Sequence, residues 1–270
     1  MHMSANSVLL AIASVSFYLL ATLLIFLRAQ RASAGQFSSD AGNGQLIPTV
    51  VALLLHLLLL YDVILGGHSV NFGLGASFTL FAWLTTFMSL AIALHTRLPA
   101  LLMILLPLNI LSIILALLLP VHWSPHGSYS AMLIAHIAFS LLAYGLLSIA
   151  ALIAILLAFQ DFQLHNHQQG MLLKQLPPLQ TLETLLFHLI EAGFLLLSFS
   201  VVSGFLFTHD WFNHKILFSI IAWVVFLILL LGRHIAGWRG KTAIRWTLAG
   251  IVALMLAIFG TKLVIEYILV

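Results

Sequence analysis

The sequence predicts an all-α fold, a polytopic integral membrane bundle of about eight transmembrane helices that forms one transmembrane domain over residues 1–270. Hydrophobic residues make up 63% of the chain and charged residues only 6%, which is far from the balance of a soluble domain. The apolar residues also fall into eight long stretches, and a bilayer core of roughly 30 Å needs about 20 apolar residues in a helix. The predicted spans cover residues 5–27, 47–65, 73–94, 99–119, 130–158, 183–207, 215–232 and 245–268.

The basic residues predict the orientation of the bundle. Eight of the ten Lys and Arg residues fall in alternate breaks between spans, and two lie elsewhere. The eight are Arg28, Arg31, Arg97, Lys174, Arg233, Arg239, Lys241 and Arg245, and the two are Lys215 and Lys262. Since cytoplasmic loops carry an excess of Lys and Arg, both termini are expected on the periplasmic side of a bacterial inner membrane. The first span is expected to be a membrane helix, because its apolar run exceeds that of a secretion signal.

The fourth span and the fifth break are the least regular parts of this pattern. Pro107 and Asn109 interrupt the fourth span, but neighbouring helices can satisfy the backbone groups that a proline frees. The fifth break, residues 160–181, is polar except near residues 171–176, where leucines beside Lys174 predict a short helix on the membrane surface. The outer loops are too short for a folded soluble domain, so any activity must reside in the helices and their rims.

Composition excludes several classes of function. The chain has no cysteine, which excludes disulfides, thiolate catalysis and iron–sulfur clusters. The pI of about 9.5 comes from the cytoplasmic breaks, and anionic lipid explains it better than nucleic acid, for which no binding module is visible. No nucleophile–base pair or phosphate loop is visible either, so an enzyme is not expected.

Histidine is the most informative residue type, because the thirteen histidines outnumber the ten Lys and Arg residues. His136 lies about two turns into the fifth span, and Ser140 and Tyr144 follow at intervals of four residues. These side chains form one polar stripe on an apolar helix. Lipid cannot satisfy such a stripe, so it is expected to face protein, a cavity or a ligand. An imidazole at this depth suits axial ligation of a haem iron, and it would equally suit a divalent transition metal.

Two further histidines lie inside predicted spans and have two interpretations each. His56 is near the middle of the second span, where a polar group marks either a functional site or a neutral imidazole hydrogen-bonded to a neighbouring helix. His188 lies in the sixth span, where it marks either a functional site or, as is expected here, a partner of Glu191 three residues on.

From His136 onward the chain contains six ordered motifs. They read HIAFSLLAYGLLSIAALIAILLAFQ (136–160), PPLQTLETLLF (177–187), GFLLLSFSVVSG (193–204), HKILFSIIAWVVFLILL (214–230), GWRGKTAIRW (237–246) and FGTKLVIEYIL (259–269). Together they resemble the CcsA-type cytochrome c assembly proteins, a haem-handling integral membrane family. Within it they resemble the short eight-span branch exemplified by YpjD and HemX, to whose second span LLLHLLLLYDVIL around His56 is also similar.

The resemblance implies roles for individual residues. His136 matches the outward-facing histidine that is a proposed axial haem ligand in the family, and His56 resembles the intramembrane histidine implicated in moving haem. His214, at the start of the seventh span, is a candidate second ligand by its location. Lys262 is either a partner for haem propionates or an ion-pair partner of Glu266, four residues on.

Departures from the family pattern limit what the resemblance implies. The long tryptophan-rich outer loop of haem-delivering members is reduced here to DWFNHK (210–215). Leu231 and Leu269 stand where those members have histidines. Complete cytochrome c synthase activity is therefore not expected.

Three functions stay open on sequence alone. The first is a haem b-binding membrane protein that assists cytochrome assembly or tetrapyrrole handling with partners from cytochrome biogenesis or haem synthesis. The second is a transporter, or its accessory, for a small substrate or metal ion, with intramembrane polar residues as the path. The third is a membrane scaffold that regulates tetrapyrrole synthesis through a cytoplasmic partner.

Overall fold

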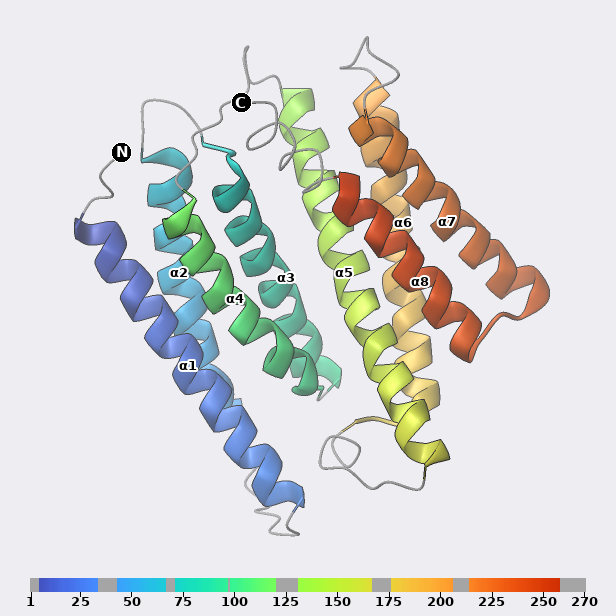
Figure 1. Cartoon of the computed structure of the whole chain (residues 1–270), viewed down its shortest axis with the longest axis horizontal. Helices are drawn as coiled ribbons and strands as arrows, with labels where there is room; N and C mark the ends of the chain where they lie inside the picture. Colours follow the sequence, from blue (N-terminus) through green and yellow to red (C-terminus); the bar gives the residue numbers. More distant parts are fainter. Residues whose placement is uncertain are drawn as a thin grey trace. The chain divides into compact units, whose positions relative to one another are not determined.

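The computed structural model describes residues 5–33, 43–66, 71–96, 98–119, 131–166, 176–205 and 214–257. Within these ranges all regular structure is helical, as Figure 1 shows, and the predicted all-α class is confirmed. The elements are α1 (Ala5–Ser33), η1 (Asn43–Leu46), α2 (Ile47–Leu65), α3 (Leu74–Thr96), α4 (Ala100–Leu118), α5 (Ala131–His165), α6 (Leu179–Phe205), α7 (His214–Ala236) and α8 (Gly240–Met255).

Seven of the helices described, α1 to α7, are long and apolar enough to cross a membrane, so the chain is a multi-pass membrane protein. The eighth predicted span, residues 245–268, is described only in its first half. α8 has 16 residues there and begins five residues earlier than predicted, at Gly240. Residues 258–270, with the rest of that span, lie outside the described part. The positions of the two termini relative to a membrane stay a prediction.

The helices on both sides of the predicted fifth break extend beyond the predicted spans. α5 continues to His165, seven residues past the predicted end at 158, and α6 begins at Leu179 instead of 183. Polar side chains can extend a helix beyond the hydrocarbon, and Asp161 and His165 pair one turn apart at 3.3 Å. The surface helix predicted at 171–176 lies almost entirely outside the described residues.

The helices form two compact units, α1–α4 with η1 and α5–α8. In unit 1, α1 packs against α2 and α4, and α3 packs against α4 and α2. In unit 2, α5 packs against α6 and α8, and α7 packs against α6 and α8. The single transmembrane domain expected from the sequence stays a prediction.

Unit 1 has a core of large apolar side chains with polar groups set among them. Tyr18, Leu59, Leu102 and Ile113 are almost fully buried in it. α4 passes through Pro107 as one helix, as predicted. Asn109 is fully buried, and its amide donates to Thr86 Oγ1 on α3 and to the carbonyl of Leu105 at 3.0 Å.

Unit 2 depends on glycines where helices approach closely. A Cβ added at Gly193 would lie 2.7 Å from Leu147 Cγ, so the absence of a side chain lets α6 lie against α5. A Cβ at Gly250 would lie 2.6 Å from the ring of Phe226, which is fully buried between α7 and α8. These contacts fix the separation of the two helix pairs.

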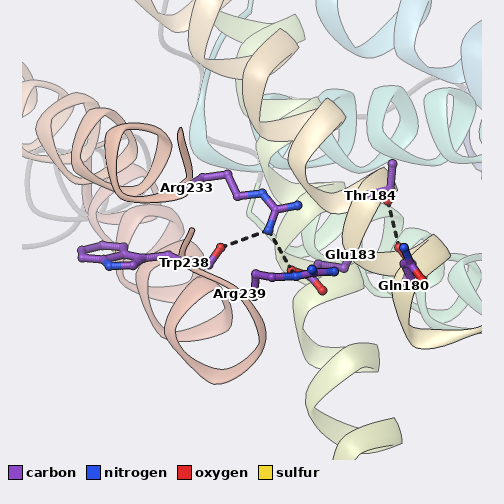
Figure 2. A network of polar contacts seen from close by, with 6 residues as sticks. All are labelled: Gln180, Glu183, Thr184, Arg233, Trp238 and Arg239. Carbon is purple, nitrogen blue, oxygen red and sulfur yellow. Dashed lines mark hydrogen bonds and ion pairs between the residues drawn. The ribbon is translucent and has the colours of Figure 1, made fainter. Parts of the chain in front are cut away.

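A charged cluster fastens the turn between α7 and α8 to α6 (Figure 2). Glu183 on α6 accepts from Arg233 Nη1 at 3.2 Å and from Arg239 Nε at 3.0 Å, both at Oε1. Arg233 also donates to the carbonyl of Trp238 at 3.3 Å, and its guanidinium lies 4.4 Å from the centre of the Phe187 ring. The cluster gathers the basic residues of this turn at one end of unit 2, next to the start of α6.

Glu183→Gln is expected to lower the free energy of unfolding by roughly 1–3 kcal/mol, because the half-exposed guanidiniums lose a largely buried anionic partner. Thermal unfolding of the purified protein in detergent measures the loss. Glu191→Gln is the matched control, since that carboxylate is 45% exposed and only meets His234 at 4.0 Å. Equal losses of unfolding free energy in both variants would show that the charged cluster does not specifically stabilise the contact between the α7–α8 turn and α6.

Candidate functional site

His136 lies at the junction of α5 and α6, near the start of α5 and the end of α6. Its imidazole is half-buried, and Nδ1 is 2.8 Å from Ser203 Oγ. The Ser203 hydroxyl donates to the carbonyl of Ser200 at 3.0 Å. A serine hydroxyl has one hydrogen, so Nδ1 must carry the proton that it shares with Ser203. The lone pair of this imidazole is therefore on Nε2.

Gly204 makes the position of this ring sterically feasible. A Cβ at residue 204 would lie 3.2 Å from His136 Cε1, closer than side chains usually pack. A larger residue at this position would require the imidazole to shift by a few tenths of an ångström. The pair Ser203–Gly204 thus supplies both the hydrogen bond and the space.

The polar stripe predicted on α5 faces protein for its whole length. Ser140 donates to the carbonyl of His136 at 2.7 Å, and its oxygen is 2.6 Å from Ser200 Oγ on α6. Tyr144, one turn further, is buried and hydrogen bonds to the side chain of Ser219 on α7. The stripe therefore joins α5 to two neighbouring helices.

Two aromatic side chains lie on the same pair of helices as the imidazole and contact each other. Phe139 follows His136 by three residues, and Phe199 precedes Ser203 by four. Their ring centres are 5.7 Å apart, and 37% of Phe139 and 53% of Phe199 is exposed. An imidazole with its lone pair on Nε2, on a helix pair that also exposes aromatic side chains, is a donor that fits the iron of a porphyrin.

Two predicted site residues cannot be placed in this geometry. His214 is the first residue of α7, and its side chain lies outside what the structure describes. Lys262 and its neighbour Glu266 also lie outside the described residues. Their roles stay predictions.

His56 is in unit 1, not in unit 2 with His136. It is fully buried, with Nδ1 3.0 Å from the Tyr18 hydroxyl and Nε2 2.9 Å from Thr79 Oγ1. Of the two interpretations of the sequence, this geometry matches the imidazole that hydrogen bonds to neighbouring helices.

The predicted pairing of His188 with Glu191 is not what the structure has. His188 is exposed, and Glu191 lies 4.0 Å from His234 on α7. Side chains three apart on a helix pair only if their rotamers converge, and here the partner comes from the next helix. In the part of the chain that the structure describes, no three His, Asp or Glu side chains gather to hold a metal ion.

Sequence reasoning missed the partners on the facing helix. Ser200, Ser203 and Gly204 belong to the motif SFSVVSG, whose small and polar residues at intervals of three and four are typical of a helix–helix contact. That spacing could have indicated a polar seam, but it does not tell which helix faces it.

Comparison of the sequence with known proteins shows which family the chain belongs to. Residues 45–269 match the model of the family described as cytochrome C assembly protein. The chain belongs to this family. His136, its partners on α6 and His56 lie inside the matched region, whereas α1 lies before it.

Two relatives show which members of the family the chain resembles. It is 32% identical to the inner membrane protein YpjD of Escherichia coli K12 over 225 residues, which are 81% of this chain and 85% of that protein. It is 27% identical to the protein HemX of Bacillus subtilis over 136 residues, which are 48% of this chain and 49% of that protein. No solved structure matches the chain. The predicted resemblance to the YpjD and HemX branch and the multi-pass inner-membrane location are confirmed.

Ser140 and Ser200 are expected to be energetically coupled, because each hydroxyl has the other as its partner across the α5–α6 contact. A double-mutant cycle with Ser140→Ala and Ser200→Ala should give a coupling free energy of about 0.6 kcal/mol, the average for interhelical hydrogen bonds in membranes. Chemical or thermal unfolding in detergent measures it. The pair Ser140→Ala and Ser198→Ala is the control, since Ser198 bonds within α6 and to Trp223. Strictly additive losses for Ser140 and Ser200 would contradict the contact.

Proposed function

We propose that this member of the cytochrome c assembly family binds haem b through His136 at the α5–α6 junction and assists cytochrome assembly without being a synthase. The observation that supports the proposal is the Nδ1 hydrogen bond to Ser203, which leaves the lone pair on Nε2. Histidines that ligate metals commonly donate their other ring N–H to an oxygen in this way. Family membership makes haem the chemically reasonable occupant.

Each residue of the junction has a defined task in this proposal. His136 would hold the haem iron through Nε2, Ser203 holds the tautomer and ring orientation of His136, and Gly204 leaves room for the ring. Phe139 and Phe199 would offer apolar contact to the haem. When bound, haem would supply an iron centre whose ligation and redox state depend on these contacts.

An accessory role fits the residues better than a complete synthase. Thioether formation needs haem to be presented to an apocytochrome, and the tryptophan-rich loop of haem-delivering members is reduced here to DWFNHK. Leu231, at the position of a family histidine, is 48% exposed on α7 and is typical of a lipid-facing side chain. The partners would be proteins of cytochrome biogenesis or haem synthesis, and lipid surrounds the bundle.

His136→Ala is expected to abolish the Soret absorbance of the protein purified from haem-replete cells or reconstituted with haemin. Ser203→Ala should retain the band and weaken haem affinity roughly 10–100-fold, as loss of an outer-shell partner typically does. Absorbance titration with haemin in detergent measures both effects, and thermal unfolding checks that the variants are folded.

His234→Ala is the matched control, because His234 is exposed and its Nδ1 contacts only a carbonyl of its own helix. It should bind haemin like the wild type. A wild-type protein that stays colourless with added haemin would refute haem binding and favour transport or scaffolding. An unchanged Soret band in folded His136→Ala would refute His136 as the ligand.

A further inference from the structure

The second intramembrane histidine, His56, is fully buried in unit 1, where its two ring nitrogens contact side chains from two other helices. Tyr18 on α1 and Thr79 on α3 lie within hydrogen-bonding distance of its two nitrogens, at 3.0 and 2.9 Å. Thr79 Oγ1 is in turn 3.2 Å from Ser112 Oγ on α4. With His56 on α2, one chain of hydrogen bonds reaches all four helices of the unit.

The end of this chain fixes the direction of every bond in it. Ser112 donates its one hydrogen to the carbonyl of Asn109 at 2.8 Å, so it accepts from Thr79. Thr79 has then used its own hydrogen and accepts from Nε2–H of His56. The Nδ1 lone pair consequently accepts from the Tyr18 hydroxyl. The proton of this imidazole is on Nε2, the opposite of His136.

This arrangement does not fit a haem ligand. Axial ligation needs a nitrogen lone pair and an open plane beside it. Here Nε2 carries a proton, Nδ1 is occupied by Tyr18, and the residue is fully buried among the side chains of unit 1. The Tyr18 ring also packs edge-on against the imidazole, with ring centres 5.8 Å apart.

We propose that His56 is the hydrogen-bonding node that holds the four helices of unit 1 together and is not a haem ligand in this chain. The proposal differs from the role that the family resemblance implies for this position. The hydroxyl that occupies Nδ1 comes from α1, which precedes the residues matched by the family model, so part of the node lies outside the shared region. Because hydrocarbon offers no other partners, breaking the node leaves buried hydroxyls unsatisfied.

Thermal unfolding of the full-length protein in detergent, with no haem added, tests the node. His56→Ala should lower the Tm by roughly 4–10 °C, since it removes a buried side chain and both of its hydrogen bonds. His56→Gln should recover most of that loss, because an amide oxygen can accept from Tyr18 while its NH2 group donates to Thr79.

Tyrosine offers a matched pair of variants. Tyr18→Phe removes one buried hydroxyl and should lower the Tm by roughly 2–4 °C. Tyr61→Phe, at a residue of α2 that is 67% exposed, should leave it unchanged. A His56→Ala variant as stable as the wild type, or equal effects of the two tyrosine variants, would overturn the node.

Haemin titration of the same variants tests the second half of the proposal. His56→Gln, which cannot replace an axial imidazole, should bind haemin with the wild-type Soret band. Loss of that band in a stable His56→Gln protein would overturn the inference while leaving haem binding itself intact. If the wild type binds no haemin, the proposed function fails, and the thermal experiment still decides whether His56 is the node.

Discussion

Polar side chains inside this bundle have to find their partners within the protein, on their own helix or on a neighbouring one, because hydrocarbon offers neither donors nor acceptors. That constraint organises both units. In unit 1 it links α1 to α4 through His56, and in unit 2 it joins α5 to α6 through His136 and the serine pairs. Apolar packing and closely approaching glycines set the helix separations, and the polar contacts determine which faces meet.

The same constraint gives the two histidines opposite chemistry. The hydroxyl that meets His136 has already given its hydrogen to a backbone carbonyl, so it accepts from Nδ1–H. The hydrogen bonds that lead from His56 Nε2 through Thr79 and Ser112 end on a backbone carbonyl. The proton of His56 is therefore on Nε2. One imidazole therefore has its lone pair on Nε2, and the other uses both of its nitrogens to hold helices together. Their positions in the sequence alone do not distinguish them.

Hydrophobic runs and basic breaks predicted the helical class and the placement of the spans, because both reflect single-residue partition between lipid and water. Helix ends were less predictable, since polar residues such as Asp161 and His165 extend α5 by pairing along it. The polar stripe on α5 could be predicted because its residues recur every four positions within one helix. Its partner Ser203 is 67 residues away, and Tyr18 is 38 residues from His56. Such pairs depend on which helices pack together, which periodicity does not specify.

The proposed function depends on one nitrogen atom, Nε2 of His136. A structure of the protein with bound haem in lipid nanodiscs would test its role most directly. We expect a porphyrin against Phe139 and Phe199 with its iron bonded to Nε2 of His136, and a closed hydrogen-bond chain around His56. Iron bonded to His56, or a porphyrin bound without any contact to His136, would contradict it.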